Sequence, residues 1–231
     1  LHQKFRHDLP GFLGRGIGIV GAVDLQQAGV AHYLFGFGGV REGPVPDDAR
    51  TLIEIESAPL REIVVAVNKF SNNVMTRMLL LNLGAEMFGP PATAAKGIKA
   101  LAAVYQRLGI DTEDLVLENG SGLSRRTRIS AATMSEVLDS ARRSRWGAEF
   151  ISSLPLSGLD GTLKRRLTSS RTRGNAHLKT GRLDGVSALA GYVHTVDSGT
   201  YTVVFFMNHP KAHRGVGNAV GDALVTWLHS R

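Results

Sequence analysis

The sequence has 231 residues, of which 43% are hydrophobic and 20% are charged, a balance typical of a folded globular domain. The absence of cysteine excludes disulfides and thiolate metal sites, and every apolar run falls far short of the roughly 20 residues that a membrane helix needs. The net charge of +7 would suit an anionic polymer, but no aromatic residues interleave the arginine clusters, so nucleic acid is not an expected partner.

The first 50 residues carry mixed signals. Apolar spacing predicts a short or bent helix over residues 5–13 and strands over residues 17–23 and 33–37, separated by glycine- and proline-rich loops. A polar joint over residues 47–50 precedes a further strand, at residues 51–56, and we place a domain boundary near residue 50. The start lacks both an initiator methionine and a signal-peptide pattern, so the chain is expected to begin inside a longer protein.

The middle of the chain is predicted to be helical. A first helix begins after Pro59 and ends at a polar break over residues 68–73, and a second then runs to Gly84. A third helix stops at Gly109, a short strand follows at residues 115–117, and Ser130 is the expected N-cap of a fourth helix.

The last third of the sequence turns to strands. One strand is predicted around residues 177–181, followed by a hairpin of residues 187–195 and 200–208. A terminal helix over residues 215–229 is expected to bury one apolar face. That face is Val216, Val220, Leu224 and Trp227. The element order predicts an α/β (α+β) domain in which helices flank an antiparallel sheet.

Two motifs in these elements point to chemistry. Ser71-Asn72-Asn73 stands in the polar break between two helices, where a hydroxyl and an amide two residues apart can enter one cleft. Lys179-Thr180-Gly181 stands in a strand, where glycine allows a peptide to approach and pair with the sheet edge. Alone, each motif is equally consistent with a helix cap, a turn or an edge strand. Their order and settings predict that Ser71, Asn73 and Lys179 converge on one cleft, with the tips of Ser71 and Lys179 within roughly 10 Å.

Other polar segments are not expected to take part in chemistry. The loop Asn119-Gly120-Ser121-Gly122-Leu123-Ser124 is interpreted as a tight turn that shapes the cleft wall. The eight histidines show no metal-ligand spacing with carboxylates, and Pro210 separates His209 from His213. We therefore predict no metal site.

The motifs and their flanking residues carry a family resemblance. Ser-x-Asn and Lys-Thr-Gly motifs, with a Ser-x-x-Lys motif, are typical of class A β-lactamases and penicillin-binding proteins. Over residues 57–231 the sequence resembles the D-alanyl-D-alanine carboxypeptidase/endopeptidase family of low-molecular-mass, class C penicillin-binding proteins. The segments that carry this resemblance are residues 57–60, 68–73, 119–124, 154–162 and 177–181.

The resemblance implies both a fold and an activity. The fold is an incomplete serine β-lactamase/penicillin-binding transpeptidase-like fold, with residues 1–50 as the end of an inserted accessory domain and residues 51–231 as the C-terminal part of the catalytic domain. The activity is that of a periplasmic serine-type hydrolase, without cofactor, that cleaves peptidoglycan stem peptides through an acyl-enzyme and is acylated by β-lactams. Carboxypeptidase and endopeptidase activity both remain open, since each cuts next to D-alanine.

The resemblance also assigns roles to the motif residues. Ser71 relays a proton to the leaving amine, and Asn73 hydrogen-bonds the substrate backbone and a catalytic lysine. The chemistry of the strand motif adds that the Thr180 hydroxyl and the Lys179 charge suit a terminal carboxylate, or Lys179 the proton relay with Ser71, and that Gly181 lets a substrate approach closely.

The family's nucleophile is the serine of Ser-x-x-Lys, and no serine in this sequence has a lysine three residues later. We therefore expect the nucleophile to lie in an N-terminal remainder of the same protein, which is then a partner of this chain, and we expect the fragment alone to be inactive. Two alternatives stay open: a catalytically inactive homologue that binds wall peptides, and a basic envelope adaptor that uses its surface charge.

Overall fold

The computed structural model describes residues 18–19, 55–169 and 171–231. The chain divides into two compact units, Leu1–Leu60 and Arg61–Arg231. In the first unit, β1 (Gly18–Ile19) pairs antiparallel with β2 (Ile55–Glu56), inside the strands predicted at residues 17–23 and 51–56. The helix predicted at residues 5–13 and the strand predicted at 33–37 lie outside the described residues. The accessory-domain boundary near residue 50 stays a prediction.

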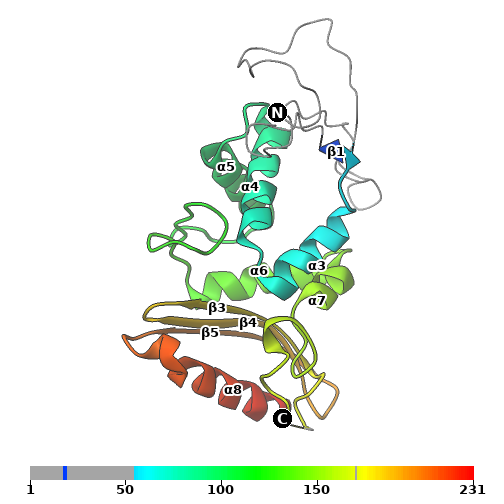
Figure 1. Cartoon of the computed structure of the whole chain (residues 1–231), viewed down its shortest axis with the longest axis vertical. Coiled ribbons are helices and arrows are strands. Elements are labelled where there is room, and N and C mark those ends of the chain that lie inside the picture. The colour runs from blue at the N-terminus through cyan, green and yellow to red at the C-terminus, as the bar shows by residue number, and fades with distance from the viewer. Residues whose placement is uncertain (1–17, 20–54, 170) are drawn as a thin grey trace, which may run out of the picture. The chain divides into compact units, whose positions relative to one another are not determined.

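The second unit is built on a three-stranded antiparallel sheet in the order β3-β4-β5 (Figure 1). Strands β3 (Ala176–Leu183), β4 (Val186–His194) and β5 (Thr200–Asn208) follow one another along the chain and pair as successive hairpins. The predicted strand around Lys179 and the hairpin after it are confirmed. Lys179 lies opposite Ala190 of β4, so it is placed in the middle of β3.

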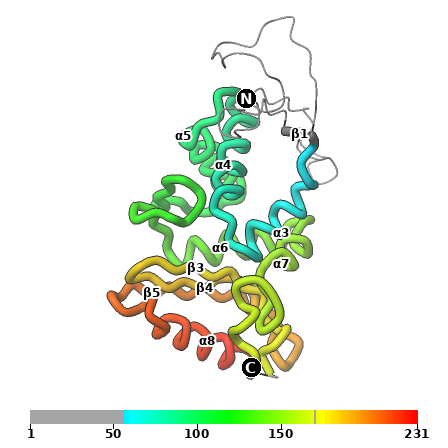
Figure 2. Tube along the Cα trace, in the orientation of Figure 1, coloured from blue at the N-terminus to red at the C-terminus, as the bar shows by residue number. Residues whose placement is uncertain are grey.

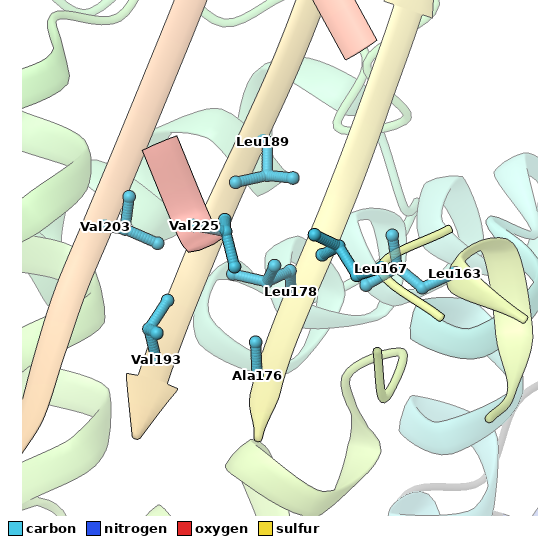
Figure 3. Packing of buried hydrophobic residues seen from close by; sticks show 8 residues of the cluster. All are labelled: Leu163, Leu167, Ala176, Leu178, Leu189, Val193, Val203 and Val225. Atoms are coloured by element: carbon cyan, nitrogen blue, oxygen red, sulfur yellow. The ribbon is translucent and has the colours of Figure 1, made fainter. Parts of the chain in front are cut away.

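Helices cover both faces of this sheet, which confirms the predicted fold class. Helix α8 (Val216–His229) packs on β4 and β5, whereas α6 (Ala131–Arg143) packs on β5 from the other face (Figure 1). Alternate side chains of the strands therefore enter two cores. The core on the α8 side is shown in Figure 3 and consists of Leu163, Leu167, Ala176, Leu178, Leu189, Val193, Val203 and Val225. The core on the α6 side is centred on Tyr192, whose side chain is fully buried against Leu138 and Leu154.

The buried face of α8 differs from the predicted one. The helix has the expected extent, but Val216, Val220 and Trp227 are 50%, 43% and 52% exposed, and only Leu224 of the predicted face packs on the core. The buried line instead begins with two glycines and continues with Val225 and His229, four residues apart. A β-carbon on Gly217 would lie only 2.2 Å from the Ser187 β-carbon. The helix can pack this closely on the sheet only because residue 217 has no side chain. The large apolar residues therefore do not mark the buried face of this helix.

The helices in the middle of the chain follow the predicted pattern with two corrections. Helices α3 (Leu60–Phe70), α4 (Asn73–Phe88) and α5 (Ala94–Arg107) are present, and Ser130 Oγ caps α6 by accepting from Thr133 N at 3.0 Å. The polar break is only two residues long, since α3 continues to Phe70. The strand predicted at residues 115–117 is a single bridge between Val116 and Arg128.

Gly84 does not end α4 as predicted. The helix continues to Phe88 and is followed by Gly89, whose φ of 71° is one that residues with a side chain rarely adopt. A β-carbon on Gly84 would lie 2.4 Å from Gly97 N, so Gly84 lies where α4 and α5 are in close contact. Within the described ranges, no helix is both long and apolar enough to cross a membrane.

Candidate active site

Ser71 lies in the two-residue link between α3 and α4. Its φ of 54° places it in the left-handed region, which is uncommon for a residue other than glycine. The link is closed by a hydrogen bond from Asn72 N to Val67 O at 3.3 Å, and Asn72 Oδ1 caps α4 by accepting from Met75 N at 3.0 Å. The Asn72 side chain is therefore occupied as a helix cap, while the half-buried Ser71 is presented at the turn.

Lys179 of β3 reaches this turn from a distant part of the sequence. Leu178 belongs to the core on the α8 side, so the alternation of the strand directs Lys179 to the opposite face. There the Lys179 ammonium donates a hydrogen bond to Ser71 Oγ across 108 residues of sequence, and it also donates to Thr180 O at 3.1 Å. The predicted closeness of Ser71 and Lys179 is confirmed.

The surroundings of Lys179 change its acidity. Burial lowers the pKa of the Lys179 ammonium below its ordinary value of 10.5, because the charged form loses solvation. A lysine in this state gives up a proton more readily than an exposed one. Lys179 can therefore donate a proton to the Ser71 hydroxyl, which can in turn donate its own proton to another group.

The predicted place of Asn73 in the cleft is not decided by these contacts. Asn73 is the first residue of α4 and its side chain is half-buried. In the part of the chain that the structure describes, this side chain makes no hydrogen bond. Its role as a substrate ligand stays a prediction.

Thr180 and Gly181 lie on the outer edge of the sheet. The first half of that edge is covered by residues 155–157, with Leu178 N donating to Pro155 O at 2.9 Å. No strand of the described ranges covers the second half, and the alternation along β3 directs the backbone groups of Thr180 to the same side as those of Leu178. Thr180 Oγ1 donates to Thr162 Oγ1 at 2.8 Å, and Gly181 is exposed. An extended peptide can therefore pair with this part of β3.

The segment that runs from Leu154 to Thr162 contributes contacts that sequence reasoning missed. Asp160 in this segment forms an ion pair with Lys69 of α3, with Asp160 Oδ2 at 2.7 Å from Lys69 Nζ. Figure 2 shows the C-terminal end of α3 beside α7 (Gly147–Ser153), and Asn68 Nδ2 donates to Ser153 Oγ at 2.7 Å. Both segments carry the family resemblance, but a single sequence gives no signal that joins residues 91 positions apart.

The loop of residues 119–124 is a tight turn, as the sequence predicts. Gly120 and Gly122 both have positive φ, and Ser121 is bonded within the loop, its hydroxyl donating to Asn119 Oδ1 at 2.8 Å. A β-carbon on Gly120 would lie 3.1 Å from the Leu80 side chain, so the turn packs directly on α4. Ser121 is thus engaged in holding the shape of the turn.

Comparisons with known proteins identify the family of the chain. Over residues 23–231 the chain matches the D-Ala-D-Ala carboxypeptidase 3 (S13) family. It is 39% identical over 164 residues to the D-alanyl-D-alanine carboxypeptidase of Actinomadura sp. (strain R39), which covers 68% of this chain and 30% of that protein. The crystal structure of penicillin binding protein 4 from Haemophilus influenzae, complexed with a β-lactam, is similar with a TM-score of 0.75 and 26% identity, over 82% of this chain and 46% of that one.

A more distant similarity concerns the fold alone. The β-lactamase from Sphaerobacter thermophilus matches with a TM-score of 0.52 and 18% identity, over 77% of this chain and 66% of that one. The chain spans less than half the length of the carboxypeptidase and of penicillin binding protein 4. The family match covers most of the chain, including both motifs, and confirms the resemblance seen in the sequence. This chain belongs to the D-Ala-D-Ala carboxypeptidase 3 (S13) family.

Proposed function

We propose that this chain supplies the Ser-x-Asn and Lys-Thr-Gly parts of a serine-type D-Ala-D-Ala carboxypeptidase or endopeptidase that acts on peptidoglycan stem peptides in the periplasm. The observation that carries the proposal is the hydrogen bond between Lys179 Nζ and Ser71 Oγ. It brings a side chain of each motif into direct hydrogen-bonded contact, which proton transfer requires. The serine nucleophile, which this sequence lacks, comes from the N-terminal remainder of the protein.

In the proposed reaction the oxygen of the nucleophilic serine attacks the carbonyl carbon of the penultimate D-alanine, and its proton passes to the lysine of the Ser-x-x-Lys motif. The C–N bond to the terminal residue then breaks, and the leaving amine takes the proton of Ser71 Oγ. Ser71 recovers a proton from the Lys179 ammonium, whose lowered pKa favours this transfer. The product is an acyl-enzyme, which water hydrolyses. A β-lactam would follow the same first step, with its ring amide as the bond that breaks.

The substrate is proposed to lie along β3 as an added strand, beside Thr180 and Gly181. The Thr180 hydroxyl then binds the terminal carboxylate, and the missing side chain at Gly181 leaves room for the peptide backbone. Asn73 hydrogen-bonds the substrate from the other side of the cleft.

The N-terminal remainder is also proposed to pack on this chain. Strand β5 pairs only with β4 in the described residues, so one edge of the sheet is open there, and the outward face of α8 exposes Val216, Val220 and Trp227. An open edge beside apolar side chains is a surface that another strand and helix would cover. If the remainder does not pack there, co-expressing the two pieces will not increase the yield of folded protein over this chain alone.

Labelling with a fluorescent penicillin tests the proposed activity. The full-length protein is expected to become covalently labelled, whereas this chain alone is not, because it lacks the nucleophile. Ser71→Ala and Lys179→Met in the full-length protein should slow labelling, and Ser230→Ala, at the C-terminal end of the chain, should not. A full-length protein that binds penicillin or wall peptide without labelling would instead be an inactive wall-peptide-binding homologue. Binding to anionic polymer that salt abolishes and Lys179→Met leaves unchanged would favour the basic adaptor.

A further inference from the structure

A second lysine near the site is bonded more completely than Lys179. Lys69 Nζ donates to Leu154 O at 2.6 Å and to the two carboxylate oxygens of Asp160 at 2.9 and 2.7 Å. An ammonium has three N–H donors, so all three are used. The Lys69 side chain is only 13% exposed, while that of Asp160 is 44% exposed. The proposed reaction gives this pair no part.

One side of the pair fixes the end of α3. Lys69 is in the last turn of that helix, and Ser71 follows two residues later in the left-handed conformation. The backbone here is held closely as well, because a β-carbon on Gly161 would lie 2.7 Å from Lys69 O. The position of Ser71 is therefore determined by where the residue 154–161 segment holds Lys69.

The other side of the pair is fixed to β3. Leu178 N donates to Pro155 O at 2.9 Å, and Asp160 Oδ1 accepts from Leu156 N at 2.8 Å, which ties the carboxylate to the same segment. Lys179 is the next residue along β3 after Leu178. The contacts thus form a closed ring that runs from Lys179 through Ser71, Lys69 and the 154–160 segment back to β3.

We propose that Lys69 and Asp160 are positioning residues that hold the Ser71 hydroxyl against the Lys179 ammonium. The effect of this positioning on catalysis rests on the function proposed above. An ion pair of this kind adds little net stability, because desolvation of the ammonium offsets much of the attraction. The pair instead fixes the position of the Ser71 hydroxyl. A displacement of about 1 Å in a catalytic group can lower the rate on the order of 100-fold.

The test uses Lys69→Met, Asp160→Asn and the double variant in the full-length protein. Each single change should slow β-lactam acylation roughly 10- to 100-fold. The loss should fall on the acylation rate constant, with non-covalent binding unchanged. The double variant should be no slower than the slower single variant, because both changes open the same ring. Asp160→Asn keeps an acceptor for Leu156 N, so it retains the local turn even if Lys69→Met does not fold.

The matched control is the ion pair between Arg166 and Asp222. Its Nη2–Oδ1 distance is 2.7 Å and its side chains are 19% and 29% exposed, but it ties the loop after η2 (Gly161–Leu163) to α8 and does not touch Ser71. Arg166→Met should leave acylation of the folded protein unchanged. An equal loss in Arg166→Met would overturn the proposal, since general destabilisation would then account for both results.

A crystal structure of Asp160→Asn separates this proposal from the function on which it rests. The expected result is that Ser71 Oγ moves beyond hydrogen-bond reach of Lys179 Nζ, roughly 3.5 Å. A contact that persists in the variant overturns the positioning role even when the wild-type protein is labelled by penicillin. A lost contact in a protein that penicillin does not label would support the positioning role and refute the proposed function alone.

Discussion

Replacing Thr180 by valine removes one hydroxyl at nearly constant shape, and the structure sets the size of the expected effect. In the proposed site this hydroxyl binds the terminal carboxylate of the peptide. In the free protein it already donates to Thr162 Oγ1 at 2.8 Å, a bond that must break first. A hydrogen bond to a charged group contributes about 1.5–3 kcal/mol and a neutral one about 1 kcal/mol. The net loss is then about 0.5–2 kcal/mol, which corresponds to a roughly 2- to 30-fold lower kcat/KM.

The assay compares D-alanine-terminated peptides that differ only at the C-terminus, one with a free carboxylate and one with an amide. Thr180→Val in the full-length protein should lose activity on the free carboxylate and much less on the amide, because the charge-assisted bond is absent from the amide. Thr162→Val is the matched control. It releases the Thr180 hydroxyl from its internal bond and should raise kcat/KM on the free carboxylate by up to about fivefold. Equal penalties for Thr180→Val on both peptides would show that Thr180 does not hold the carboxylate.

Three further changes test other parts of the structure. Because burial lowers the pKa of Lys179, the unfolded state binds more protons than the folded state between that lowered value and 10.5. The stability of the wild-type protein should therefore rise with pH through this window, and the rise should be absent in Lys179→Met. If urea unfolding from pH 7 to 10.5 gives the same pH dependence of stability for both proteins, the prediction is wrong. Gly181→Val should block the peptide and slow acylation without unfolding the sheet, although its β-carbon would lie 3.3 Å from that of Ala188. Rescue by an added Ala188→Gly would identify cross-strand crowding as the cause. Tyr192→Phe leaves Leu138 O without the buried donor now 2.6 Å away, so unfolding should cost about 1–3 kcal/mol less, and a change under about 0.5 kcal/mol in denaturant would refute that bond's importance.

The strands and most helices of the second unit could be predicted because their signals are local. The period of the apolar residues, the Ser130 cap and the turn between β4 and β5 each operate over a few residues, and the elements found there agree with them. The errors arise where packing between elements decides the outcome. Gly84 and Gly217 look like helix breaks or gaps in sequence, but in the structure each lies in close contact with a neighbouring element.

The candidate site shows the same division. Ser71 and Lys179 could be paired in advance because their motifs have a known order, and their contact follows. In sequence, Lys69 resembles an ordinary cation in the last turn of a helix, where its positive charge would interact favourably with the helix dipole. Its partner Asp160 lies in a loop that becomes adjacent only when the 154–160 segment docks on β3. No local pattern encodes that docking, so the pair becomes visible only in three dimensions.

The contact between Gly84 and Gly97 has a consequence for how inherited variation can alter this protein. A β-carbon on Gly84 would lie 2.4 Å from Gly97 N, so any larger residue must push α4 and α5 apart. Asn73 begins α4, eleven residues before Gly84, which is roughly 16 Å along the helix. Because an α-helix is rigid, a shift of α4 at Gly84 also displaces its first residue, Asn73. Under the function proposed above, selection for slower acylation by penicillin in the full-length protein is therefore expected to recover substitutions at these two glycines, far from either motif, as well as in the motifs themselves.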